Sequence, residues 1–175
     1  RQHGLFVRLA RATYDAATAA GVDFVMGFPN EMSAPGFKKR LDWELPHSDY
    51  VASIDKVRLC AIAERSPLID ADDLRLDLTQ EATRRWRLSR PGAVYEWRDG
   101  LAYKAFRGAI DLIAFSDVKQ LSALPADTRI NLLVPATNAG LAAFKSFDYQ
   151  FGGLSLATPF VPSRILRQMA VSDVF

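Results

Sequence analysis

The chain has very little cysteine and histidine. Its 175 residues include one cysteine, Cys60, and two histidines. A single thiol cannot build a disulfide framework, so the cytoplasm is the expected compartment. The sequence contains no metal-ligand spacing, and two histidines give no convincing Ser-His-Asp or Cys-His set. The composition therefore predicts a protein that needs neither a metal ion nor disulfide bonds.

Long hydrophobic runs and an excess of one charge are also missing. No uncharged apolar run approaches the roughly 18 residues of a membrane span, and the sequence does not open with a signal-peptide pattern. The formal net charge of +2 is too small to indicate nucleic-acid binding. The basic runs 38–40 and 84–87 fit solvated helix faces better. We therefore expect a soluble domain without a membrane partner, and nucleic acid is disfavoured.

The first 43 residues join a glycine turn, a helix, a strand and a second helix. Apolar residues recur there at helical steps of three and four: Leu5, Leu9, Ala12, Ala16 and Ala20. Gly21 suits the end of that helix, and residues 22–28 form an apolar run typical of a strand covered on both faces. A helix that begins after a glycine turn presents free N–H groups and a positive dipole end. This arrangement suits a diphosphate.

These segments resemble a known family. Residues 1–6, Arg-Gln-His-Gly-Leu-Phe, look like the acyl-CoA pyrophosphate loop of the GNAT N-acyltransferases, whose usual pattern is Arg/Gln-x-x-Gly-x-Gly/Ala. Segments 27–30 and 36–43 resemble the family's next element, in which a splayed strand end leads to an Asn-led helix. The resemblance covers residues 1–65 well and the remainder only in outline.

The resemblance implies an acyl-CoA-dependent N-acyltransferase, in the simplest case an N-acetyltransferase. Acetyl-CoA or another acyl-CoA would be the co-substrate, and the amine of a small molecule or peptide would be the acceptor; a homodimer is left open. The implied cofactor-binding residues are Arg1, Gln2, His3, Gly4, Leu5, Phe6, Gly27, Phe28 and Asn30. A plain helix entry at Gly4 and a plain N-cap at Asn30 are the structural alternatives.

The catalytic acid of the family is missing at its usual place. Many members carry a tyrosine about seven residues after the Asn, and this chain has Phe37 there. A phenyl ring cannot donate a proton, so Tyr14 and Tyr50 are the remaining candidates. The alternative function is a non-catalytic GNAT-like module that binds CoA or a protein partner.

The rest of the chain alternates strand-like, helical and loop segments. Residues 64–73 are typical of a linker, Thr79 is a candidate N-cap, Asp99-Gly100 predicts a hairpin, and Ser116 is a candidate cap for a short helix to residue 124. The expected strands are 51–54, 58–63, 94–98, 101–106, 109–115 and 129–134, and the expected helices include 79–88 and one from Asn138 to about residue 147.

A short internal repeat suggests two related halves. Residues 27–43 and 135–149 each follow a buried strand, begin an Asn-led segment and end Lys-x-apolar-Asp-aromatic. We therefore predict an α/β fold, a GNAT-like mixed sheet flanked by helices. It would consist of the C-terminal part of an acyl-CoA-binding domain over 1–65 and a second, degenerate GNAT-like domain over 66–175. Chance similarity of two short patterns is the alternative.

The two halves are not equivalent as cofactor sites. Before the second Asn-led segment, residues 115–121 contain no glycine, and Asp117 would repel a diphosphate. Only the first half should therefore bind CoA. Because Arg1 already lies inside the resembled core, we also expect a missing preceding part. The edge of strand 22–28 should then be covered by the second half, by another chain, or by a segment outside this sequence.

Overall fold

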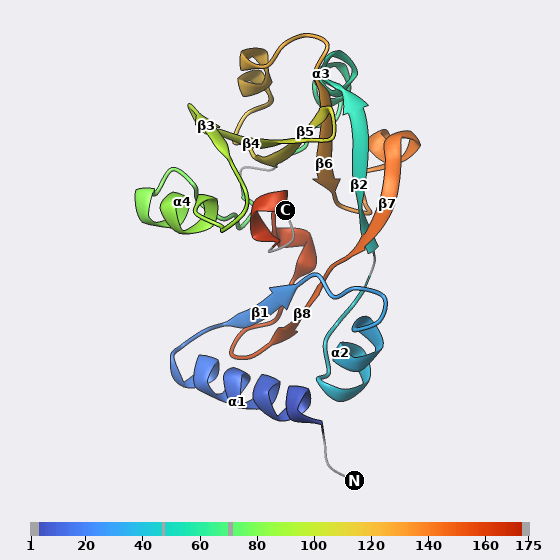
Figure 1. The fold of residues 1–175 in the computed structure, drawn as a ribbon. Coiled ribbons are helices and arrows are strands. Elements are labelled where there is room, and N and C mark those ends of the chain that lie inside the picture. The colour runs from blue at the N-terminus through green and yellow to red at the C-terminus, as the bar shows by residue number, and fades with distance from the viewer. Residues whose placement is uncertain (1–3, 47, 70–71, 173–175) are drawn as a thin grey trace. The chain divides into compact units, whose positions relative to one another are not determined.

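The computed structural model describes residues 4–46, 48–69 and 72–172, and its fold is mixed α/β (Figure 1). The chain forms two compact units. Unit 1 contains residues 1–48 and 149–163, and unit 2 contains residues 49–148 and 164–175. Unit 1 is thus discontinuous in sequence. Within the described residues, no helix combines the length and apolar character that a bilayer crossing requires.

Unit 1 contains two helices and a two-stranded sheet. Helix α1 (Leu5–Ala19) ends as predicted: Gly21 has φ +77°, its N–H donates to the Thr18 carbonyl, and the Val22 N–H donates to the Ala17 carbonyl. These two bonds form a Schellman motif, which only a residue tolerant of positive φ completes cheaply. The elements are α1 (Leu5–Ala19), β1 (Phe24–Gly27), α2 (Ala34–Arg40) and β8 (Gly152–Ser155).

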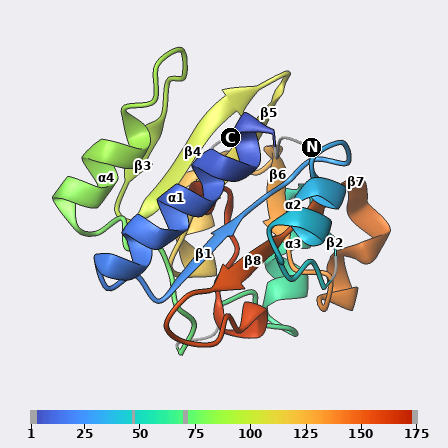
Figure 2. The same ribbon diagram turned by 90° about the horizontal axis from the view of Figure 1, so that it is seen from below.

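The two strands of unit 1 come from distant parts of the sequence. β1 pairs antiparallel with β8, with Gly27 opposite Gly152. On its other edge β8 meets Glu44, whose backbone exchanges two hydrogen bonds with Gly153. Val7, Leu41 and Trp43 form the buried cluster on which α1, α2 and the strands pack. Figures 1 and 2 both show α1 running beside β1 and β8.

Unit 2 is built on a six-stranded mixed sheet in the order β3-β4-β5-β6-β2-β7. β5 and β6 are parallel, whereas the pairs β3–β4, β4–β5 and β2–β6 are antiparallel. The predicted hairpin is present, because Asp99 and Gly100 both have positive φ between β3 and β4. The strands are β2 (Ser48–Asp55), β3 (Glu96–Arg98), β4 (Leu101–Phe106), β5 (Ala109–Ala114), β6 (Arg129–Val134) and β7 (Lys145–Gln150).

The hydrophobic core of unit 2 lies between one face of this sheet and the helical segments that pack on it. Alternate residues of the central strands, such as Ile54, Leu112 and Ile130, point into that core and are almost fully buried. Leu59 and Leu121 reach it from the helical segments. The elements that contribute to this core are helix α3 (Lys56–Ala63) and the 3-10 segments Val118–Ala123 and Ala139–Phe144. Helix α4 (Glu81–Leu88) and the 3-10 segments Pro162–Arg164 and Met169–Val171 contribute no described residue to it.

The opposite face of the sheet is partly covered by the chain's C-terminal segment. The 3-10 turn Met169–Val171 packs against β5. Arg87 of α4 is buried and donates to the carbonyls of Met169, Ala170 and Ser172 at 2.6–3.1 Å. Arg167 forms a buried ion pair with Asp49, with 2.6 Å between Nε and Oδ2. These cations hold the segment in place.

Three local predictions need correction. Residues 58–63, predicted as a strand, lie in α3, because the Asp55 carboxylate accepts the Arg58 N–H and caps a helix. Thr79 does not cap α4: its hydroxyl donates to Asp77, and the helix begins after Gln80. The helix expected from Asn138 to residue 147 is a 3-10 turn that gives way to β7 at Lys145.

The structure does not show two related halves. β1 lies in the two-stranded sheet of unit 1, whereas β6 is a central strand of the six-stranded sheet of unit 2. The compact units also differ in their bounds from the division at residues 65 and 66. That division, as a statement about two GNAT-like domains, stays a prediction.

We expect Gly153→Ala to destabilise unit 1. An added Cβ would lie 2.5 Å from the Val25 carbonyl oxygen and 2.7 Å from the Phe160 ring, so backbone would have to move. Overpacking of this kind costs about 1–3 kcal/mol in unfolding free energy. Denaturant unfolding followed by circular dichroism would measure it.

Gly36→Ala is the matched control, because nothing lies within 4 Å of its added Cβ and it sits in α2. Alanine is the better helix former, so this variant should be neutral or slightly more stable. Equal unfolding free energies for the two variants would contradict the close approach at Gly153.

Candidate functional site

The start of α1 is an exposed helix N-terminus. Gly4 is the N-cap, its carbonyl accepts the Val7 N–H at 3.0 Å, and no side chain caps the helix. Leu5 and Phe6 are 70% and 53% exposed, and the first turn contains no acidic residue. Among the described residues, nothing lies within 4 Å of a Cβ built at Gly4, so none of them blocks the approach of an anion to this helix end. The predicted residues Arg1, Gln2 and His3 lie outside the described residues.

Asn30 organises the turn before α2. Its side-chain oxygen accepts the Ser33 N–H at 2.9 Å, and its carbonyl accepts the Ala34 N–H at 2.8 Å. Ser33, rather than Asn30, is the N-cap residue of α2. Asn30 is exposed, and Phe28 before it stacks on Tyr149 with ring centroids 4.9 Å apart. The Asn-led segment is therefore a capped turn followed by a short helix.

An aromatic cluster joins these predicted residues within unit 1. Phe6 on α1 packs edge-on against Phe37 on α2 at 5.4 Å, and Phe37 packs against Trp43 at 4.6 Å. A Cβ on Gly27 would lie 3.4 Å from the Trp43 ring. The structure thus links the first turn of α1, α2 and the end of β1, while Phe28 packs separately against Tyr149 and Phe151.

The two tyrosine candidates differ in their surroundings. The Tyr14 hydroxyl belongs to the same cluster and accepts the Trp43 indole N–H at 2.8 Å. Burial raises the pKa of Tyr14, and the hydrogen bond from Trp43 partly opposes that shift. Tyr50 lies in unit 2, where its hydroxyl donates to the Asn138 carbonyl at 2.6 Å, and burial raises its pKa. Of the two, only Tyr14 lies with the predicted cofactor residues.

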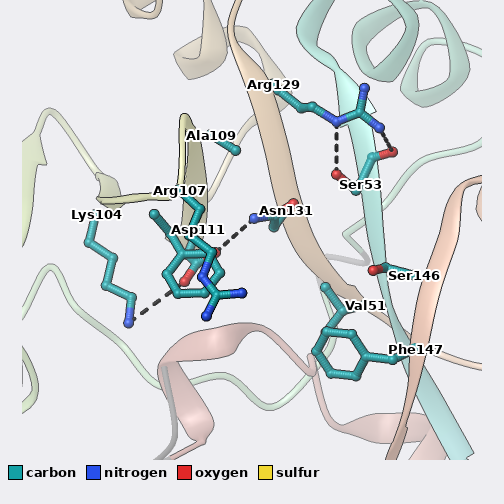
Figure 3. A pocket seen from close by; sticks show the side chains of 11 residues that line it. Val51, Ser53, Lys104, Arg107, Ala109, Asp111, Arg129, Asn131, Ser146 and Phe147 are labelled. Carbon is teal, nitrogen blue, oxygen red and sulfur yellow. Dashed lines mark hydrogen bonds and ion pairs between the residues drawn. The ribbon is translucent and has the colours of Figure 1, made fainter.

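A second candidate site was not predicted from the sequence. A pocket of about 460 Å³ lies on the unit 2 sheet face that the helical core leaves free. Figure 3 shows its side chains around an open space. Its lining residues come from five neighbouring strands and one turn: Val51, Ser53, Lys104, Phe106, Arg107, Ala109, Asp111, Arg129, Asn131, Ser146 and Phe147.

Polar side chains cross this face in register. Lys104 lies opposite Asp111, Asp111 opposite Asn131, and Asn131 opposite Ser53, so one row spans β4, β5, β6 and β2. Asp111 is buried; its carboxylate accepts from Asn131 at 3.0 Å and pairs with the Lys104 ammonium at 3.6 Å. The sequence does contain a signal for this row, because polar residues stand at alternate positions of otherwise apolar strands. Only the strand order and the register show that these residues lie side by side.

Among the described residues, no group of three or more His, Cys, Asp or Glu side chains is placed to hold a metal ion. Neither candidate site therefore points to a metal centre within those residues.

Comparison with known proteins adds little to this geometry. No protein-family model matches the chain, and no curated protein matches it in sequence. One solved structure is similar, a "putative acetyltransferase" from Pyrococcus horikoshii, with a TM-score of 0.45 and 12% identity. The match covers 98% of this chain and 66% of that one, so this chain spans just under two thirds of its length.

We expect Tyr14→Phe to destabilise unit 1 at neutral pH, because the Trp43 indole N–H loses its acceptor. An unsatisfied donor of this kind costs about 1–3 kcal/mol. Urea unfolding at pH 8, followed by tryptophan fluorescence, would measure the loss. Tyr50→Phe in unit 2 is the comparison, because it removes a hydroxyl that donates to the Asn138 carbonyl and so leaves an acceptor, not a donor, without that bond.

The wild type and Tyr14→Phe together also test the pKa of Tyr14. A folded-state pKa above the ordinary 10.0 favours the neutral phenol in the folded protein. The stability that this shift contributes is present below pH 10 and is lost as the pH rises through the folded-state pKa. Between pH 8 and 11 the wild type should therefore lose more stability than Tyr14→Phe. Parallel losses would contradict the assignment.

Proposed function

We propose that this protein is an acyl-CoA-dependent N-acyltransferase of GNAT type. In this proposal it transfers an acyl group, in the simplest case acetyl, from CoA to the amine of a small molecule or peptide. Unit 1 would bind the cofactor. The cofactor-binding part, predicted over residues 1–65, would then comprise residues 1–48 together with residues 149–163. The cytoplasm remains the proposed compartment, and a homodimer remains open.

The observation that supports this proposal most is the N-terminus of α1. A 15-residue helix begins at an exposed glycine with no acidic first-turn residue and no side-chain cap. The unpaired N–H groups and the positive end of the helix dipole suit a diphosphate. In unit 1, helix α1, strand β1 and helix α2 follow Gly4 in the predicted order, although α2 begins after Ser33 and Asn30 only organises the turn before it.

In this proposal, residues of unit 1 bind the diphosphate, polarise the thioester and donate a proton. Backbone N–H groups at Gly4 to Phe6 would bind the diphosphate, and a backbone N–H near Gly27 or Phe28 would donate to the thioester carbonyl oxygen. The acyl-CoA supplies the activated thioester. Tyr14 is the proposed proton donor to the leaving thiolate, because its hydroxyl accepts the Trp43 indole N–H and keeps its own proton for donation.

Phe37 favours a second candidate function, a non-catalytic module that binds CoA or a protein partner. Phe37 packs between Phe6 and Trp43, and its ring has no proton to donate. Release of free CoA thiol from acetyl-CoA with a panel of primary amines separates the two functions: turnover supports the enzyme, and binding without turnover supports the module.

Gly4→Asp should weaken binding of acetyl-CoA by about ten- to a hundredfold. The substitution places a side chain and a negative charge where the diphosphate must approach, and losing a charged-group interaction typically costs about 1.5–3 kcal/mol. Calorimetric titration of the full chain with acetyl-CoA measures the change.

Ala16→Asp is the matched control, because it adds the same charge at an exposed position three turns further along α1. Its affinity should stay close to that of the wild type. Absence of wild-type binding, or equal affinities for Gly4→Asp and wild type, would remove the main support for the cofactor site.

A further inference from the structure

The polar pocket of unit 2 has features that the proposed acyl transfer does not use. All of its lining residues belong to unit 2, whereas the proposed cofactor residues belong to unit 1. Its volume of about 460 Å³ falls within the range of small-molecule sites. The pocket is therefore considered as a binding site in its own right.

The charge around this pocket is predominantly positive. Lys104, Arg107 and Arg129 face a single carboxylate, Asp111. Because Asp111 is engaged by Lys104 and Asn131, it offsets the ammonium of Lys104 and leaves the charges of the two arginines uncompensated within the lining. A partly enclosed site with excess positive charge attracts anions.

Arg129 is held in place before any ligand arrives. Its Nε donates to the Ser53 hydroxyl at 3.0 Å, and its Nη2 donates to the Ser53 carbonyl at 3.3 Å (Figure 3). These bonds use two of the five guanidinium N–H donors, so the group is oriented and still has donors for a ligand. A preorganised cation binds an anion at lower entropic cost.

Most of the remaining wall is apolar. Phe106 and Phe147 are 43% and 47% exposed, and the buried Val51 lies on β2, the strand beside β7. The Arg107 guanidinium lies 5.2 Å from the Phe106 ring centroid. Exposed rings beside fixed cations can cover the flat apolar body of a ligand while the arginines bind its charge.

We propose that this pocket binds a small organic anion, with a carboxylate or phosphate group on an aromatic or similarly flat apolar body. Arg107 and Arg129 contact the anionic group, and Phe106 and Phe147 contact the apolar body. Asp111 acts as a positioning residue, because it fixes Lys104 and Asn131 in the row across the sheet.

The test uses the full chain and three probes of similar size: phenyl phosphate, phenylacetate and the uncharged benzyl alcohol. Calorimetric titration should show at least one anion binding to a single site about tenfold or more tightly than benzyl alcohol. Tighter binding of phenyl phosphate assigns the site to phosphates, and tighter binding of phenylacetate assigns it to carboxylates. Equal binding of all three probes, or binding of none, would overturn the proposal.

Two variants remove charge from the pocket. Arg129→Gln should weaken the tighter anion about tenfold, since a charge-assisted hydrogen bond is lost. Arg107→Asn should also weaken it, and it should fold well, because Arg107 has φ +50° in a turn where asparagine is favoured. Arg58→Gln is the control, an exposed arginine of α3 outside the pocket. If Arg107→Asn folds and binds like Arg58→Gln, the assignment is wrong.

The test is also separable from that of the proposed function. Gly4→Asp lies in unit 1 and should bind the anionic probe as the wild type does, even where its affinity for acetyl-CoA falls. Loss of probe binding in Gly4→Asp would place the anion at α1 and overturn the unit 2 site.

Discussion

Unit 1 depends on the close backbone contacts of β8. Gly152 and Gly153 lie between β1 on one side and Glu44 on the other, and a Cβ at either position would come within 2.5 Å of a backbone oxygen. Only glycine allows this approach without displacement. Because β8 links β1 to the segment after α2, it also fixes the strand end and the aromatic cluster around Trp43. The proposed cofactor site is thus supported by residues more than a hundred positions away in sequence.

Much of the local structure could be predicted from the sequence. The strands 101–106 and 129–134 agree exactly with β4 and β6, and the helix after Gly4 ends at Gly21 as expected. These segments carry their own signals: period-two or dense apolar runs, turn dipeptides and a glycine at positive φ. The error at residues 58–63 has a local cause as well, since the apolar run hid the cap that Asp55 provides.

The long-range features could not be predicted in the same way. The sequence Gly-Gly-Leu-Ser of β8 has poor strand propensity, and its pairing with β1 supplies the structure. Likewise, Lys104, Asp111, Asn131 and Ser53 become a row only when the order and register of four strands are known. The sequence resemblance drew attention to the cofactor residues of unit 1 and gave no indication of the polar pocket in unit 2.

Because unit 1 is discontinuous in sequence, its two parts are synthesised at different times. Residues 49–148 must leave the ribosome before β8 can pair with β1. At about 5–20 residues per second, translation of that intervening segment takes roughly 5–20 s. During that interval the apolar side chains of α1, α2 and β1 lack the strand that completes their packing. Unit 1 therefore cannot complete its packing until unit 2 residues 49–148 have been synthesised.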